Sequence, residues 1–250
     1  LLTIQNMLEQ LEPSLLGPKL KPLQQRLDDM LTGQGLSAET LSQRVRLVHA
    51  GKRRLKLKCF ELIAKATLER KQIRIQHFNR QTGITVERII SPQHLVHYRD
   101  NWYVDSWCHL RKEVRSFAVD AITECEQLIE DAKELDADQL RVSMQSGYGI
   151  FGGAVKDWAK LKFSPERARW VKQEEWHASQ KGHELTDGSY ELEVPYSDER
   201  ELVGDILRFG SDVRVVSPVS LRTQVLAELK KLSEAYQTDF PLRFRSTTEP

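Results

Sequence analysis

The stretch from Arg88 to Ile122, RIISPQHLVHYRDNWYVDSWCHLRKEVRSFAVDAI, decides the fold of this chain. It alternates short runs of aromatic and β-branched residues with turn signals at Ser91-Pro92 and Asp100-Asn101. Runs this short and this closely spaced are typical of a small, strongly bent antiparallel sheet or barrel.

The sequence before this stretch extends the pattern. Residues 59–70, CFELIAKATLER, predict a helix because Phe60, Ile63, Ala64 and Leu68 share one face. Five runs then predict five strands: QIRIQHFN, ITVERIIS, HLVHYR, WYVDSWCH and RSFAV. A helix followed by five such strands is the order of an Sm-like or SH3-like barrel. We therefore expect an α+β protein with a small β-barrel domain over residues 59–135.

Residues 158–240 predict a second α+β domain. Strands are expected at 160–163, 174–178, 189–196 and 212–216, with helices after Ser164, after Ser197 and over 217–236. Ser164-Pro165 is a helix start, because serine caps free backbone N–H groups and proline suits the first helical position. The order β-α-β-β-α-β with a terminal helix predicts a ferredoxin-like domain.

Two segments are predicted as connections. Residues 1–58 predict amphipathic helices, whose apolar faces need the rest of the chain, an upstream domain or a second copy as partner. Residues 136–157 contain QSGYGIFGG, which fits neither common phosphate-loop pattern, so we interpret them as a flexible linker. The chain starts at Leu1 rather than Met, and we expect its natural N-terminus to lie upstream.

The charge is unevenly distributed although the whole chain carries only +1. Residues 51–123 contain 15 Lys or Arg and 7 Asp or Glu, a surplus of +8, together with four of the seven histidines. Such a block suggests an anionic partner such as a nucleotide or nucleic acid. Attraction between a basic and an acidic domain explains it equally well, and charge alone does not separate the two.

Signatures of enzymes are missing from the sequence. It contains no HExxH, no GxSxG and no zinc-deaminase pattern. The three cysteines include no CxxC pair, which fits free thiols in a reducing cytoplasm. His94 and His97 are three residues apart in a predicted strand, so they face opposite sides and make a poor metal pair. We expect no catalytic activity, no metal, no cofactor and no membrane span.

The basic block mixes arginine with aromatic residues. The planar guanidinium group suits phosphate, and aromatic rings can stack on bases. The cations considered are Arg74, Arg80, Arg88, Arg99, Arg111, Lys112 and Arg115, and the aromatic residues are Tyr98, Trp102, Tyr103, Trp107 and Phe117. We expect Trp102 and Phe117 in the core, whereas Tyr98 and Tyr103 fit either core or site.

The same residues resemble the WYL domain of bacterial transcriptional regulators over about residues 60–124. The resemblance rests on Arg88, Pro92, Leu95, Trp102-Tyr103-Val104, Arg111, Arg115, Phe117 and Asp120 to Ile122. Residues 158–237 resemble the C-terminal extension that often follows such a domain. Three positions depart from the family pattern: Val104 replaces Leu, His77 replaces Tyr, and Ala121 replaces a basic residue.

The resemblance implies an Sm-like barrel that senses an anionic ligand, with nucleic acid or a nucleotide favoured. It also implies a homodimer, and promoter binding through an upstream winged helix-turn-helix that this chain does not contain; residues 1–58 would then serve as a helical linker or dimerisation segment. The ligand-binding residues implied by position are Arg88, Arg111, Arg115, His77, His94, Tyr103 and Tyr98. The alternative function is a protein-interaction or dimerisation module that binds no small ligand.

Overall fold

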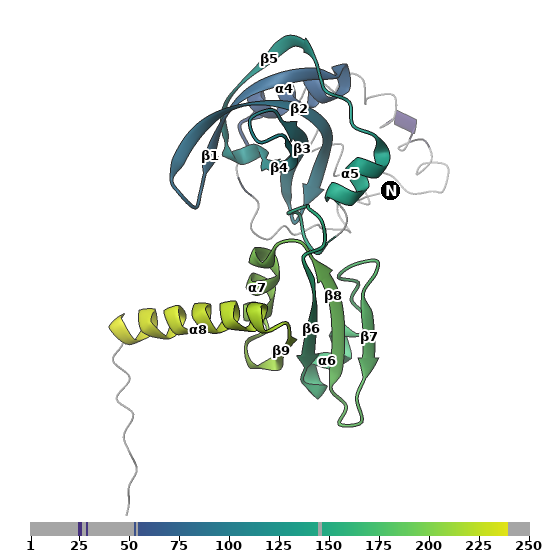
Figure 1. Ribbon diagram of the computed structural model, residues 1–250, viewed down its shortest axis with the longest axis vertical. Helices are drawn as coiled ribbons and strands as arrows, with labels where there is room; N and C mark the ends of the chain where they lie inside the picture. Colours follow the sequence, from purple (N-terminus) through teal and green to yellow (C-terminus); the bar gives the residue numbers. More distant parts are fainter. Residues whose placement is uncertain (1–24, 27–28, 30–52, 54, 145–146, 240–250) are drawn as a thin grey trace, which may run out of the picture. The chain divides into compact units, whose positions relative to one another are not determined.

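The computed structural model describes residues 25–26, 29, 53, 55–144 and 147–239 (Figure 1). The chain divides into two compact units, residues 1–136 and 137–250. Most of the helical segment expected over 1–58 lies outside the described residues. Within the described part of the chain, no helix is long and apolar enough to cross a membrane.

The first unit consists of one helix and a five-stranded antiparallel sheet. In chain order the elements are α4 (Leu57–Glu69), β1 (Lys71–Asn79), β2 (Ile84–Tyr98), β3 (Asn101–Cys108), β4 (Glu113–Ala118), the 3-10 turn η1 (Val119–Ala121) and β5 (Ile122–Asp131). The strand order is β4-β3-β2-β1-β5, so β4 and β5 are the two edges. This mixed composition confirms the α+β class.

The expected barrel is not closed. After η1 the chain passes to the opposite edge, where β5 pairs with β1, while β4 pairs with β3. No pairing joins β4 to β5 among the described residues. The Sm-like or SH3-like assignment is therefore not confirmed, although the helix and the bent antiparallel sheet are present.

One face of this sheet, here called the inner face, carries the core. Ile73 and Ile75 of β1 and Ile90 of β2 are fully buried there, and so is Ile63 of α4. Trp102 and Phe117 lie in the same cluster with 7% and 3% of their surface exposed, as the sequence predicted. Burial of these side chains holds α4 on the sheet, because each removes apolar surface from water.

The second unit contains a four-stranded antiparallel sheet with the order β7-β8-β6-β9. Its elements are α5 (Ala137–Met144), β6 (Asp157–Phe163), α6 (Pro165–Val171), β7 (Lys181–Glu184), β8 (Tyr190–Tyr196), α7 (Glu199–Arg208), η2 (Gly210–Asp212), β9 (Val213–Ser217) and α8 (Val219–Asp239). The element order β-α-β-β-α-β with a terminal helix is the expected one. The ferredoxin-like assignment itself stays a prediction.

Helix capping in this unit follows the sequence signals. The Ser164 side chain accepts a hydrogen bond from the Arg167 backbone N–H at the start of α6. Asp198 accepts one from the Arg200 N–H at the start of α7. These side chains satisfy N–H groups that have no partner inside the helix.

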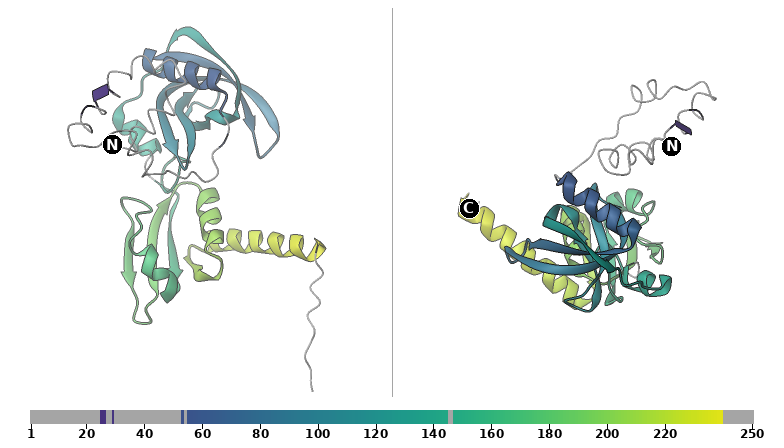
Figure 2. Two further views of the ribbon diagram at one scale, coloured as in Figure 1. Left: turned by 180° about the vertical axis from the view of Figure 1, so that it is seen from behind. Right: turned by 90° about the horizontal axis from the view of Figure 1, so that it is seen from above.

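Helix α8 has two different halves (Figure 2). Leu221 and Val225 are buried in the core of the unit. Further along the helix, Leu229, Leu232 and Tyr236 are 44%, 50% and 64% exposed. The second half of α8 therefore presents an apolar stripe that its own unit does not cover.

Candidate functional site

The strand register separates the seven predicted site residues. Paired residues in an antiparallel sheet lie on one face, and neighbours along a strand alternate between faces. Ile75 pairs with Arg88, and His77 lies two residues beyond Ile75, so both belong to the inner face. Arg115 joins them through its pairing with Ser106, which lies two residues from Cys108, the partner of Ile90.

The other predicted residues lie elsewhere. His94, Tyr98 and Tyr103 point to the opposite face, here called the outer face, because their register partners alternate with the inner-face residues. Arg111 lies in the exposed turn between β3 and β4. The structure thus brings together His77, Arg88 and Arg115, and it does not bring the remaining four to them.

Arg88 is the centre of the inner-face group. Its Nη1 donates to the Cys108 sulfur over 3.8 Å, while its Nε is buried without a hydrogen-bond partner. The hydroxyl of Ser106, a fully buried residue, also has no partner. A buried polar group without a partner costs about 1–3 kcal/mol, so unsatisfied atoms of this kind mark a place where a ligand or water belongs.

The pKa of His77 is lowered by its position in this group. Burial first, and then the charges of Arg88, Arg80 and Arg115, lower the pKa of His77 to about 4 against the opposing effect of Asp120. The ring meets Phe117 edge-on with the ring centres 5.2 Å apart. His77 is therefore neutral near pH 7, and the net charge of the group comes from the arginines.

Asp120 completes the group, and the sequence pointed to it only as part of the closing "D-x-I" of the motif. Its side chain is 5% exposed and forms an ion pair with Arg80 and another with Arg53, the latter at 3.6 Å. Arg53 also donates from Nη1 to the Tyr103 hydroxyl over 3.3 Å. The role of Arg53 was missed, because it precedes the helix and no periodic pattern connects it to the sheet.

The "inner-face cluster" is from here on His77, Arg80, Arg88, Ser106, Arg115 and Asp120. It contains three guanidinium groups, of which Arg80 pairs with Asp120 and Arg115 with Glu113, one neutral imidazole, and two buried donors without a partner, Arg88 Nε and Ser106 Oγ. Guanidinium groups bind phosphate and carboxylate through paired hydrogen bonds. The arrangement is therefore suited to an anion. Among the described residues, no three His, Cys, Asp or Glu side chains are placed to hold a metal ion.

The outer-face residues have structural contacts. His94 is exposed and lies opposite Asp105 in the register. Burial raises the pKa of Asp105, partly offset by the hydrogen bond that Ser116 donates over 2.5 Å. Tyr103 is 8% exposed and meets Tyr98 edge-on, with 6.5 Å between the ring centres. These contacts account for both tyrosines as packing residues.

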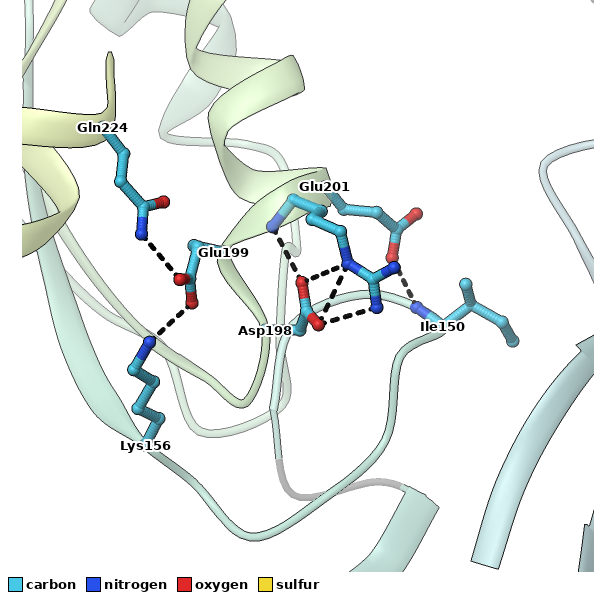
Figure 3. A network of polar contacts seen from close by, with 7 residues as sticks. Ile150, Lys156, Asp198, Glu199, Glu201 and Gln224 are labelled. Carbon is cyan, nitrogen blue, oxygen red and sulfur yellow. Dashed lines mark hydrogen bonds and ion pairs between the residues drawn. The ribbon is translucent and has the colours of Figure 1, made fainter. Parts of the chain in front are cut away.

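The glycine-rich segment is neither a free linker nor a phosphate loop (Figure 3). The backbone N–H of Ile150 donates to the Glu201 carboxylate over 2.6 Å, and Lys156 binds Glu199 at 2.8 Å. Gly149 has φ +90, and a Cβ there would lie 2.0 Å from the Glu201 oxygen. A carboxylate of the chain itself thus takes the N–H that a phosphate would need, and the expected flexible linker is wrong for this part.

The sequence was compared with protein-family models. The WYL domain model matches residues 58–127, and the WCX domain model matches residues 156–233. The first range covers the helix and sheet that carry the inner-face cluster. The second covers all four strands of the other sheet.

Curated relatives agree with these matches. Protein PafC of Mycobacterium tuberculosis (strain ATCC 25618 / H37Rv) is 29% identical over 154 residues, which are 62% of this chain and 47% of PafC. PafC of Mycobacterium leprae is 23% identical over 69% of this chain and 52% of its own length. The DNA-binding transcriptional repressor CapW of Pseudomonas aeruginosa is 38% identical over 21% of this chain and 17% of CapW. The chain thus spans about half the length of the PafC proteins.

Solved structures with some likeness include the proteasome accessory factor B/C (PafBC) of Arthrobacter aurescens. The TM-score is 0.34 at 22% identity, over 75% of this chain and 29% of PafBC. A CRISPR Cas-related protein gives a TM-score of 0.46 at 13% identity, over 73% of this chain and 52% of that one. These TM-scores are too low to support a conclusion.

The two domain matches and the curated relatives point to one family. Of these relatives, CapW is by its name a DNA-binding transcriptional repressor. The resemblance stated from Arg88 to Ile122 is confirmed by the WYL match over the same residues. The chain therefore contains a WYL domain followed by a WCX domain.

Proposed function

We propose that this chain is the ligand-sensing portion of a bacterial DNA-binding transcriptional regulator, and that the inner-face cluster binds an anionic effector, either nucleic acid or a nucleotide. The observation that carries the proposal is the pair of unsatisfied buried donors, Arg88 Nε and Ser106 Oγ, beside Arg115 and His77. Phosphate oxygens accept hydrogen bonds from donors of this kind and would neutralise part of the surrounding positive charge.

The same proposal covers the whole regulator. Since the chain spans about half of its PafC relatives, promoter binding is assigned to a winged helix-turn-helix outside this sequence. The active form is a homodimer in the cytoplasm, and the first unit is an Sm-like sensing domain. Within this scheme residues 59–135 sense the effector and residues 158–240 form the C-terminal extension.

The test is a titration of the full chain with short single-stranded oligonucleotides and with nucleotides at low salt. We expect binding to weaken at least about tenfold in Arg88→Ala and in Arg115→Ala, because each removes a phosphate contact. The slope of log affinity against log salt should also become shallower by about 1 for each lost contact.

Arg74→Ala is the matched control. Arg74 is 43% exposed and paired with Glu126 at 2.6 Å, and Arg115 is 44% exposed and paired with Glu113 at 3.3 Å, but Arg74 faces the other side of the sheet. The control should bind like the wild type. Absence of binding at low salt, or equal weakening in Arg74→Ala and Arg115→Ala, would contradict the proposal.

The alternative, a protein-interaction module without a small ligand, is favoured by the exposed stripe of Leu229, Leu232 and Tyr236 on α8. It predicts a stable oligomer whose size decreases when Leu232 is replaced by Glu. Analytical ultracentrifugation of wild type and variant measures this directly. An oligomer that persists in Leu232→Glu, together with effector binding, leaves the sensing function as the better account.

A further inference from the structure

Two of the three cysteines lie together although they are 66 positions apart in the sequence. Cys59 belongs to the first turn of α4, and Cys125 belongs to β5. Cys59 lies in the core cluster of this unit and Cys125 packs against that cluster, and the neighbouring Cys59 thiol helps to raise the pKa of Cys125. Contact between two thiols is the first geometric requirement for a disulfide.

The surroundings fix this pair in place. Cys125 pairs with Ile75 of β1 and therefore points toward α4 on the inner face. Lys56, directly before α4, donates from Nζ to the Thr123 carbonyl over 3.2 Å. The first turn of α4, which carries Cys59, therefore lies beside the first half of β5, which carries Cys125.

The third cysteine is in a different environment. Cys108 is fully buried on β3, where its sulfur accepts a hydrogen bond from Arg88. Cys125 is half-buried, so a small reagent can reach it from solvent, whereas Cys59 is 7% exposed and Cys108 is not exposed at all. The three thiols therefore differ both in access and in partner.

We propose that Cys59 and Cys125 form a reversible intramolecular disulfide when the protein meets a low-molecular-weight disulfide such as oxidised glutathione. One thiolate attacks the reagent and releases one reduced thiol, which leaves a mixed disulfide on the protein. The second thiol then displaces the remaining reagent as another reduced thiol. The two protein sulfurs become joined, the reagent takes up two electrons, and the two thiol protons pass to the released thiols.

The rate of disulfide formation at this pair should depend on pH. Burial, followed by the hydrogen bond and the charge of Cys59, raises the pKa of Cys125 to about 12. Only the thiolate is the nucleophile in thiol–disulfide exchange. Oxidation should therefore be slow at pH 7 and faster at pH 9. Once formed, the bond should raise Tm, because it closes a long loop of the unfolded chain.

The experiment treats the full chain with oxidised glutathione, blocks the remaining thiols by alkylation, and maps the cross-link by mass spectrometry of a non-reduced digest. We expect one peptide pair that joins Cys59 to Cys125, with Cys108 alkylated, and a return to three free thiols after reduction with dithiothreitol. The same treatment in denaturant should give a mixture of pairings, which provides the reference for an unstructured chain.

Cys108→Ser should keep the cross-link at the wild-type rate, and Cys125→Ser should lose it. If Cys125→Ser does not fold, the wild type and Cys108→Ser still decide the question. A native pairing pattern equal to that of the denatured chain, a link that includes Cys108, or glutathione adducts without a Cys59–Cys125 bond after equilibration would each overturn the proposal. The outcome does not depend on whether the inner-face cluster binds an effector.

Discussion

Charged side chains differ in their ion-pair partners between the WCX sheet and the inner-face cluster of the WYL domain. On the WCX sheet, Lys160 binds Glu193 at 2.8 Å and Lys162 binds Asp187 at 2.9 Å. In the inner-face cluster, Arg88 and Arg115 stand near each other and near His77, and the Arg88 Nε has no partner. The lysines of the WCX sheet are paired, whereas the inner-face cluster combines paired guanidinium groups, Arg80 with Asp120 and Arg115 with Glu113, with a buried Arg88 Nε that has no partner.

This difference separates structural charge from charge that is available to a ligand. Ion pairs near the surface add little to stability, and their charged groups are already occupied and not available to a ligand. Like charges held together lower stability, so their presence points to a partner outside the chain. The contrast therefore supports the WYL domain, rather than the WCX domain, as the place where an anion binds.

The largest expected effect tests whether the two sheets have separate cores. Phe163 of β6 is fully buried and meets Trp176 and Phe209 edge-on. Phe163→Ala should destabilise the WCX unit by about 3–5 kcal/mol through loss of burial and cavity formation. Hydrogen exchange measures each sheet separately, and protection should decrease in β6 and β8 while β1 and β2 keep theirs. Ile129→Ala, at a side chain that is 91% exposed, is the control. Equal loss of protection in both sheets would contradict independent cores.

The second prediction concerns how the free energy of unfolding depends on pH through His77. The pKa of His77 is about 4 in the folded protein, against about 6.5 for an unperturbed histidine, so the unfolded chain takes up its proton first as pH falls. Stability from this residue is complete above about pH 6.5 and decreases down to about pH 4, by less than about 3 kcal/mol because solvent screens the partly exposed ring.

His77→Gln should remove this part of the pH dependence. Urea denaturation at pH 7 and pH 4.5 gives the free energies of unfolding, and the wild type should lose more than the variant between the two conditions. His183→Gln, in the WCX domain, should follow the wild type. Parallel losses in wild type and His77→Gln would show that burial and the arginines do not lower the pKa of His77.

The smallest expected effect concerns the WCX ion pairs. Lys160 is half-buried with 33% of its side chain exposed, and its contact with Glu193 holds the pKa of Lys160 above its ordinary value. Lys160→Gln should leave Tm almost unchanged, because solvent and salt screen such pairs. It should also leave nucleotide affinity unchanged in the titration that detects Arg88→Ala. A clear loss of affinity in Lys160→Gln would move the anion site, or part of it, to the WCX domain.

Much of the WYL sheet was readable from its turn signals. Asp100-Asn101 correctly separated β2 from β3, and the apolar face of residues 59–70 correctly predicted α4. Ser91-Pro92 was misleading, because β2 continues through it with a bulge between Pro92 and His94. Proline lacks the N–H for the ladder, and a bulge accommodates it without ending the strand.

Exposed strands were the hardest to predict. β5 is mostly exposed and carries acidic residues where a half-buried strand would alternate, so no period-2 pattern revealed it. β7, KGHE, contains no β-branched residue and is exposed throughout, and the strand expected at 174–178 is wrong. Such segments become strands because they pair with a neighbouring strand, and the local sequence pattern does not reveal that pairing.

The candidate site was predicted in part for the same reason. Arg88, Arg115 and His77 fall on one face because strand alternation is regular on either side of the Pro92 bulge. That bulge shifts the register once and leaves His94 and Tyr98 on the outer face with Tyr103. Arg53 and Asp120 meet through the packing of α4 on the sheet, which no local pattern encodes.

The attachment of the glycine-rich segment also determines how this protein can be divided into parts. The Tyr148 hydroxyl donates to the buried Asp205 over 2.6 Å, and the Tyr148 N–H donates to the Pro195 carbonyl over 2.8 Å. A fragment that starts at Trp158 would lack the Tyr148 hydroxyl that donates to Asp205 and the Ile150 N–H that donates to Glu201. A WCX fragment that folds by itself should instead begin at or before Gly147, so that it includes Tyr148 and Ile150 and keeps their hydrogen bonds.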